Sequence, residues 1–381
     1  MAKRKKAVQA KARAGKRSTK PGRKSAKKAV KATKARAEAV APATGPVTLD
    51  EAVALAQIKR PELAVQAVRA TAAPPSPAAV GAERAKLRKE QREEHARRIR
   101  EYKATMTIMK ARGARRPRLK GFKAGEGEPT AEDAESFVPL QILAEGDSWF
   151  DYPAFIGGGI IPRLAGRLGV PILNLAKAGD EVRYMLGVEE RLVLADQLSG
   201  GSPAGGPWDV VLFSGGGNDI VGNPMALWVK DFNPAIPPAS NINQPRFDAA
   251  LALVRAGYED LITLRDQLSP QTHLVFQGYD FPIPDGRGIC FLGPWLKPTF
   301  DLRKFPTLAA GEAVIKAMLQ QFAAMLTTLA GPKVTFINTQ GTLLQQTASW
   351  HNELHPARAG FEKFADLFQQ KLKVLFPDRV A

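Results

Sequence analysis

The sequence predicts an α/β domain over residues 137–381, built on a five-stranded parallel sheet covered by helices on both faces. Short apolar runs rich in Val, Ile, Leu and Phe, typical of buried strands, alternate there with longer segments of helical periodicity. Polar, glycine-containing motifs directly follow most of the runs. Strands that alternate with helices pair in parallel, and their carboxyl ends meet at one edge of the sheet, where sites gather.

The elements are expected in strict alternation. Strands are predicted at residues 140–144, 171–176, 209–213, 272–277 and 333–338, and helices at 160–168, 181–198, 247–268, 309–329 and 360–375. Two long connections, 222–246 and 279–306, are rich in Pro and aromatic residues. Loops of this length are usually functional, so we expect lids that select the substrate, with a scaffold covering the sheet edge as the alternative.

The net charge differs between the N-terminal third of the chain and the rest. Residues 1–120 hold 34 Lys and Arg against 9 Asp and Glu, a net charge of +25, whereas residues 121–381 are mildly acidic at −7. The overall net charge of +18 therefore describes the N-terminal third and not the α/β domain. Because residues 1–36 contain 16 basic residues and no acid, they are expected to be disordered and to attract nucleic acid or another polyanion. A solubilising tail without a dedicated partner is the alternative.

Three parts are expected: a Lys/Ala-rich basic tail at 1–47, a helical extension with linkers at 48–136, and the α/β domain. Within the extension, residues 48–70 predict a helical hairpin and 83–112 one long charged helix. The stripe Ile99, Tyr102, Met106 and Met109 on that helix could dock on the domain, on another copy, or on an anionic surface. A solvated helix packed by this narrow stripe is the simplest interpretation.

Three further features of the sequence bear on where in the cell the protein is expected. Cys290 is the single cysteine, so an internal disulfide is excluded. No apolar run reaches the roughly 20 residues of a membrane span, and the basic N-terminus lacks the apolar segment of a secretory signal. We therefore expect a soluble, cytoplasmic protein.

The candidate nucleophile is Ser148. It follows the first predicted strand and Gly146-Asp147, where a helix after the strand would direct free backbone N–H groups at it. A serine hydroxyl needs a base to remove its proton. Of the four histidines, His355 is the plausible base, because it lies in the loop between the last strand and the last helix.

An acyl-transfer intermediate also needs hydrogen-bond donors for its oxyanion. The N–H of Ser148, the N–H of Gly179 and the side-chain amide of Asn218 would supply three, from three different loops. Glycine at 179 is expected to let the backbone approach closely, and Asn218 is a neutral donor that does not titrate.

Four motifs in this order resemble the SGNH (GDSL) hydrolase family: Gly146-Asp147-Ser148, Asn174 to Asp180, Gly215 to Asp219, and Asn352 to Pro356. Ser148, Gly179, Asn218 and His355 match the four residues that name the family. The resemblance, over roughly 137–375, implies a three-layer α/β/α fold and hydrolysis of carboxylic esters, often acyl groups on sugars or lipids. A Gly-x-Ser-x-Gly elbow, the mark of α/β-hydrolases, is absent around Ser148.

The sequence departs from the family at one catalytic position. The family usually has Asp three residues before the histidine, and this chain has Asn352. Loss of that carboxylate can cost about 10⁴ in rate. Asn352 could still orient the ring through its oxygen, Glu353 or another carboxylate could substitute, or Ser148 and His355 could act as a dyad.

Several other residues have simpler interpretations. Asp147, Asp151 and Asp219 are expected to hold loops or cap helices. His351 and His355 are four residues apart, but Glu353 is one place late for a His-Glu-x-x-His zinc motif and Pro356 disfavours a helix, so we expect no metal. Cys290 is expected to be an inert buried thiol.

The leading hypothesis is a serine ester hydrolase that requires no cofactor, with Trp149, Tyr279 and Trp295 as the candidates for contacting the substrate. An acyltransferase would carry the same motifs. The alternative is a polyanion-binding or scaffold protein whose hydrolase-like domain has weakened catalysis, which the basic tail and Asn352 both favour.

Overall fold

The computed structural model describes residues 77–112, 138–153, 158–288 and 293–380. The basic tail, the hairpin expected at 48–70, the segment 113–136, Cys290 and Phe291 lie outside the described residues. None of the helices in the described part is long and apolar enough to cross a membrane.

Five parallel strands form one sheet, as the sequence predicts. They run in the order β2-β1-β3-β4-β5. β1 and β3 are buried along their whole lengths, which explains why they consist of apolar runs without alternation. The strands are β1 (Ile142–Gly146), β2 (Ile172–Asn174), β3 (Val210–Ser214), β4 (His273–Gln277) and β5 (Val334–Ile337).

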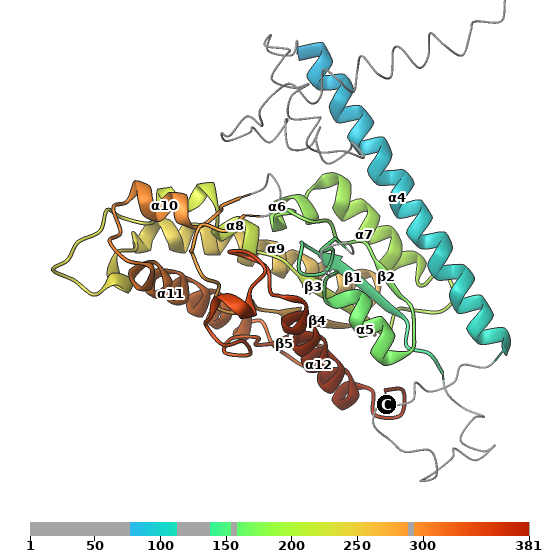
Figure 1. Ribbon diagram of the computed structural model, residues 1–381. Coiled ribbons are helices and arrows are strands. Elements are labelled where there is room, and N and C mark those ends of the chain that lie inside the picture. The colour runs from blue at the N-terminus through green and yellow to red at the C-terminus, as the bar shows by residue number, and fades with distance from the viewer. Residues whose placement is uncertain (1–76, 113–137, 154–157, 289–292, 381) are drawn as a thin grey trace, which may run out of the picture. The chain divides into compact units, whose positions relative to one another are not determined.

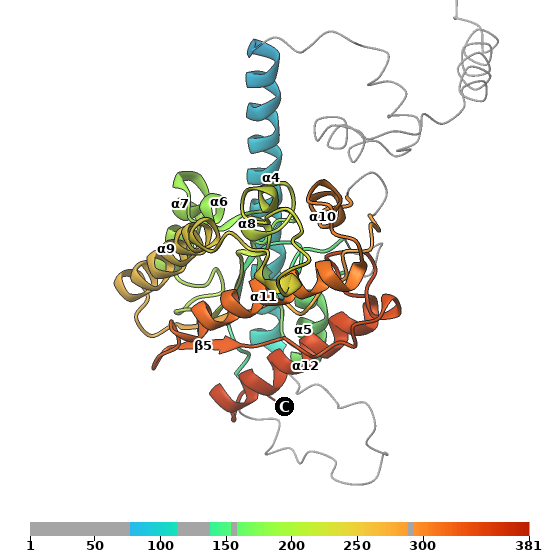
Figure 2. The same ribbon diagram turned by 90° about the vertical axis from the view of Figure 1, so that its left-hand side faces the viewer.

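Helices cover both faces of this sheet, which gives the three-layer α/β/α fold (Figure 2). On one face α5 (Ile160–Leu168) packs against α12 (Arg358–Leu375). On the other face α9 (Gln244–Leu268) contacts both α7 (Val188–Gly200) and α11 (Leu308–Thr327). The core is continuous through all three layers.

The single helix expected at 181–198 is wrong in one respect: it is divided into α6 (Val182–Met185) and α7. Gly187, the N-cap of α7, has extended backbone angles that interrupt the helix. A side chain at Gly187 would lie 2.8 Å from the carbonyl oxygen of Arg183, so the close turn between α6 and α7 requires glycine.

The two long connections contain short elements and pack against each other. The first holds η2 (Asn223–Leu227) and η3 (Pro238–Ser240), and the second holds α10 (Lys297–Leu302). The ring of Phe305 lies 5.2 Å from that of Phe232 and 5.0 Å from that of Phe300. The contact between Phe232 and Phe305 therefore joins the two connections.

The long helix α4 (Pro77–Arg112) runs beside the edge strand β2 (Figure 1). Tyr102 and Met106 are buried, and Ile99 and Met109 are partly buried against the same core. The ring of Tyr102 lies 5.5 Å from that of Trp208. The expected apolar stripe thus docks on the α/β domain.

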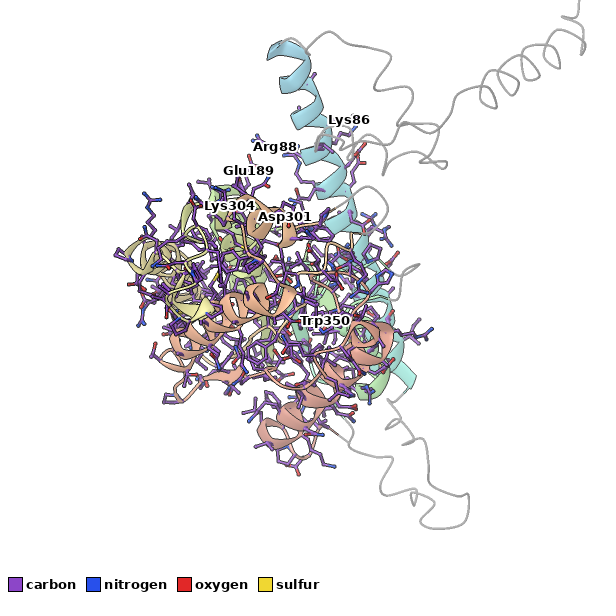
Figure 3. All side chains as sticks on the ribbon, turned by 60° about the vertical axis from the view of Figure 1, so that its left-hand side comes forward. Lys86, Arg88, Glu189, Asp301, Lys304 and Trp350 are labelled. Atoms are coloured by element: carbon purple, nitrogen blue, oxygen red, sulfur yellow. The ribbon has the colours of Figure 1, made fainter. Side chains whose placement is uncertain are left out.

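Polar contacts add to this docking. Arg88 pairs with Glu189 of α7 at 3.0 Å, and Figure 3 shows the two side chains beside each other. Arg98 donates to the carbonyl oxygens of Asn174 and Ala176, and it pairs with Asp151 at 3.2 Å. α4 therefore holds both the end of β2 and the segment that follows Ser148.

Candidate active site

Ser148 lies in a tight turn at the carboxyl end of β1. The N–H groups of Phe150 and Asp151 both donate to the carbonyl oxygen of Asp147, so the chain makes one helical turn there. The helix predicted at 160–168 is confirmed as α5, so only this single turn follows the strand directly. A single turn is enough to place the Ser148 hydroxyl at the rim of the sheet.

Asp147 holds this turn in place. Its Oδ1 accepts from the N–H of Trp149 and from the Ser214 hydroxyl, and its Oδ2 accepts from the Tyr279 hydroxyl at 2.5 Å. Burial raises the pKa of Asp147 to about 6, against the opposing effect of these hydrogen bonds. The carboxylate links the carboxyl ends of β1, β3 and β4, which confirms its expected loop-holding part.

His355 contacts Ser148 directly. Its Nε2 lies 2.6 Å from Ser148 Oγ, and its Nδ1 lies 3.0 Å from Oδ1 of Asn352. The same Asn352 oxygen accepts from the N–H groups of Leu354 and His355, which identifies it as the carbonyl oxygen. His355 Nδ1–H therefore donates to Asn352, and Nε2 is left to accept the proton of Ser148.

The imidazole is kept neutral by its surroundings. His355 is only 7 % exposed, and Asn352 is fully buried. Burial first, and then repulsion by His351, lower the pKa of His355 to about 3. A carboxylate in place of Asn352 would have opposed both effects. The neutral Asn352 therefore leaves the effects of burial and of His351 unopposed.

Tyr152 and His351 extend this hydrogen-bond chain. Asn352 Nδ2 donates to the Tyr152 hydroxyl at 3.2 Å, and that hydroxyl lies 2.7 Å from His351 Nδ1. The Tyr152 ring also stacks on the His355 ring, with 4.4 Å between ring centroids and 26° between planes. No pattern in a single sequence identified Tyr152, which is an aromatic residue four positions after Ser148.

Glu353 does not orient His355. Its fully buried carboxylate accepts four backbone N–H groups: those of Gly286 and Lys297 at Oε1, and those of Trp295 and Leu296 at Oε2. The alternative that gave Glu353 a catalytic part is therefore wrong. Glu353 instead ties the second long connection to the loop that carries His355.

Asn218 and Gly179 belong to neighbouring loops. Asn218 Nδ2 donates to the carbonyl oxygen of Asp180 at 2.8 Å, so the residue beside Gly179 is held at the Asn218 amide. Gly179 has φ +87°, and a Cβ there would meet no atom within 4 Å. The left-handed backbone therefore favours glycine at 179, and no protein atom crowds the position. The close approach of this backbone to an oxyanion stays a prediction.

Asp219 and Asp151 have structural roles, as the sequence predicts. Asp219 Oδ2 accepts from the N–H of Val182 at the start of α6, and burial raises the pKa of Asp219 to about 6. Asp151 pairs with Arg98 of α4. Asp219 therefore caps α6, and Asp151 holds the loop after Ser148 to α4.

The three aromatic candidates for substrate contact lie in two places. Trp149 and Tyr279, whose rings meet edge to face at 5.2 Å, line a cavity beside Ser148 and Asn218. Trp295 is half-buried and lies edge-on to His355, with 5.9 Å between ring centroids. The two sides of the serine therefore have different surroundings.

The histidines do not form a metal site. His351 Nδ1 faces Tyr152, whereas both ring nitrogens of His355 face Asn352 and Ser148. Within the described ranges no group of three His, Cys, Asp or Glu side chains could hold a metal ion.

Solved structures provide similar folds at low identity. A lipase from a goat rumen metagenome is 16 % identical and has a TM-score of 0.40, over 61 % of this chain and 96 % of that one. An extracellular lipase from Streptomyces rimosus is also 16 % identical, with a TM-score of 0.37 over 61 % and 99 %. A carbohydrate esterase of family 3 from Talaromyces cellulolyticus is 13 % identical, with a TM-score of 0.35 over 63 % and 99 %. No curated protein matches the chain.

The sequence profile of the GDSL-like lipase/acylhydrolase family matches residues 145–363, which is more than half of the chain. The matched segment begins in β1, just before the turn of Ser148, and ends in α12, after His355. The chain belongs to the GDSL-like lipase/acylhydrolase family and is a hydrolase of ester bonds.

Proposed function

We propose that the protein is a serine esterase in which Ser148 is the nucleophile and His355 the general base. The observation that carries the proposal is the 2.6 Å contact between Ser148 Oγ and His355 Nε2, with the imidazole held in the accepting tautomer by Asn352. This arrangement comes from two loops 207 residues apart in the chain.

In the first half-reaction Ser148 Oγ attacks the ester carbonyl while its proton moves to His355 Nε2. The N–H groups of Ser148 and Gly179 and the Asn218 amide stabilise the oxyanion. The Asn218 amide donates one hydrogen to Asp180 and has a second hydrogen for the oxyanion. His355 then protonates the leaving alcohol, and water attacks the acyl-enzyme by the reverse sequence of proton transfers.

Asn352 is the proposed orienting residue, supported by Tyr152 and His351. It fixes the direction of the ring, but it supplies no negative charge to stabilise the imidazolium that forms in the transition state. We therefore expect slower turnover than a carboxylate at the same position would allow. Trp149 and Tyr279 on one side, and Trp295 on the other, are the proposed substrate contacts.

A fluorophosphonate probe tests the assignment directly. Full-length protein should be labelled at Ser148, the Ser148→Ala variant should not, and Ser214→Ala serves as the matched control. Ser214 is a buried serine that contacts Asp147 but not His355. Folded protein that leaves Ser148 unlabelled would contradict the proposal.

The second candidate function is a polyanion-binding or scaffold protein whose hydrolase-like domain has weakened catalysis. The neutral Asn352 beside His355 favours it. The 16 basic residues among 1–36 are the proposed polyanion-binding segment. Deletion of 1–36 should lower the salt concentration at which the protein elutes from heparin or DNA. Unchanged elution would remove the polyanion claim and leave the esterase assignment untouched.

A further inference from the structure

A small cavity opens beside Ser148, on the side of β3 and β4. Its volume is about 30 Å³. Ser148 and Asn218 line it together with residues from the ends of β3 and β4, from α11 and from the loop before His355. The other lining residues are Asp147, Trp149, Gly217, Val221, Tyr279, Asp280, Pro282, Leu319 and Leu354.

The cavity presents no free charge to a ligand. The Asp147 carboxylate is occupied by Trp149, Ser214 and Tyr279. The Asp280 carboxylate is 1 % exposed and accepts the N–H groups of Phe281, Gly341 and Leu343. With both carboxylates satisfied by the protein, the group that enters the cavity must be apolar.

The position of the cavity identifies which part of an ester enters it. Asn218, the proposed oxyanion donor, lines the cavity, and His355, the proposed acid for the leaving alcohol, does not. His355 faces Trp295 and Tyr152 instead. The acyl chain therefore points into the cavity, and the alcohol leaves on the side of His355.

The volume limits the length of the acyl chain. One water-sized group needs roughly 10–15 Å³ by this measure. A cavity of about 30 Å³ therefore holds about two such groups, which correspond to the carbons of an acetyl or propionyl chain. Leu319 is 2 % exposed and Val221 is 8 % exposed, so these two walls are backed by the core and cannot move aside cheaply.

We propose that this cavity is the acyl site, that it admits acetyl and propionyl groups, and that Leu319 and Val221 set the limit. The proposal rests on the proposed function, because the acyl carbon must form its bond to Ser148 Oγ as its bond to the alcohol oxygen breaks. The Ser148 proton passes through His355 Nε2 to the departing alcohol.

A panel of p-nitrophenyl acetate, propionate, butyrate and octanoate tests the limit with the full chain. The value of kcat/KM should be highest for acetate or propionate and should fall by about 10-fold or more at butyrate, because one methylene too many in a hydrophobic pocket is discriminated by about that factor. Octanoate should be hydrolysed more slowly still.

Leu319→Ala should raise the butyrate-to-acetate ratio of kcat/KM by about 10-fold, since it lengthens the cavity. Leu326→Ala is the matched control: Leu326 is fully buried two turns further along α11 and does not line the cavity. Both variants should lower the melting temperature, and only Leu319→Ala should change the ratio. Val221→Ala gives a second enlargement from a different wall.

The proposal would be overturned if the wild-type protein hydrolysed the octanoate ester with the same kcat/KM as the acetate ester. It would also be overturned if the butyrate-to-acetate ratio of kcat/KM were the same in the Leu319→Ala, Val221→Ala and Leu326→Ala variants. In both cases fluorophosphonate labelling of Ser148 would show that the esterase assignment stands. Folded protein that cleaves no ester and takes no label would overturn the acyl site together with the esterase assignment.

Discussion

The two sides of Ser148 differ in shape and in polarity. On the side of β3 and β4 a small cavity has mainly apolar walls, and both carboxylates that line it are hydrogen-bonded within the protein. On the side of His355 the half-buried Trp295 and a chain of polar groups, Asn352, Tyr152 and His351, surround the imidazole. We therefore expect selectivity for the acyl group to depend on packing in the cavity, and the rate to depend on the hydrogen bonds that orient His355.

The largest effect should come from Ser148→Ala, which removes the group at which the two sides meet. We expect kcat/KM for p-nitrophenyl acetate to fall by about 10⁴-fold or more, as with other serine nucleophiles. Circular dichroism and the melting temperature should stay close to those of wild type. Substantial residual activity in this folded variant would place the nucleophile elsewhere.

Glu353→Gln should weaken the connection between the loop that carries His355 and the backbone of Gly286 and of residues 295–297. A glutamine amide would turn hydrogens toward backbone N–H groups that now share a carboxylate oxygen. Loss of such buried, charge-assisted hydrogen bonds should lower the free energy of unfolding by about 3 kcal/mol. Glu189→Gln is the control, because Glu189 is an exposed partner of Arg88 and should change stability by less than about 1 kcal/mol. Equal denaturation midpoints for the two variants would show that Glu353 is no anchor.

Asn352→Asp should increase the difference between the two sides of Ser148, because it places a negative charge next to His355. The new carboxylate would accept from His355 Nδ1, from the N–H groups of Leu354 and His355, and from the Tyr152 hydroxyl. We expect kcat at pH 8 to rise by about 10-fold, since the reverse change in a Ser-His-Asp enzyme costs about 10⁴. A decrease in kcat would mean that this site is built for asparagine.

The same variant should change the pH profile. With a pKa of about 3, His355 is neutral and able to accept a proton throughout the range from pH 5 to 8, so wild-type kcat/KM should not fall with the protonation of His355 there. A carboxylate favours the imidazolium and raises the pKa of His355, so the Asn352→Asp variant should lose activity at a higher pH as pH falls. Identical acid limbs would contradict the expectation that a carboxylate at position 352 raises the pKa of His355.

The smallest effect is expected from Tyr152→Phe, which keeps the ring stacked on His355 but removes the hydroxyl that accepts from Asn352. The loss of one hydrogen bond of about 1 kcal/mol should lower kcat by about 5-fold and leave KM unchanged. In the Asn352→Asp background the loss should differ, because the carboxylate would accept from Tyr152. A rise in KM alone would assign Tyr152 to substrate binding.

The sequence predicts the strands and the positions of Ser148, Asn218 and His355 well, because both depend on short local patterns. The five strands were located within two residues at each end, since buried parallel strands are continuous apolar runs. Ser148 and His355 could be paired because each follows a strand end, and parallel strand ends meet at one edge. Asn218 was found for the same reason.

Some roles depend on the direction of a side chain, which the sequence does not show. Asn352 and Glu353 were both possible partners of His355, and only the folded loop shows that Asn352 faces the ring, whereas Glu353 faces the backbone of Gly286 and of residues 295–297. Tyr152 acts through a hydroxyl contact that has no periodicity. The need for glycine at 179 depends on φ, which motif spacing does not encode. The composition of the long connections leaves lids and a scaffold as alternatives, because it does not show which aromatic residues pack against each other.

α4 covers part of the sheet edge at β2. β2 is an edge strand, and Arg98 already occupies the carbonyl oxygens of Asn174 and Ala176 at its end. Tyr102 and Met106 shield the apolar surface next to it. A truncation that starts after residue 112 would uncover both the hydrogen-bonding edge and that apolar patch, the combination through which sheets of separate molecules join. We therefore expect α4 to limit self-association through this edge, in addition to supporting the turn that carries Ser148.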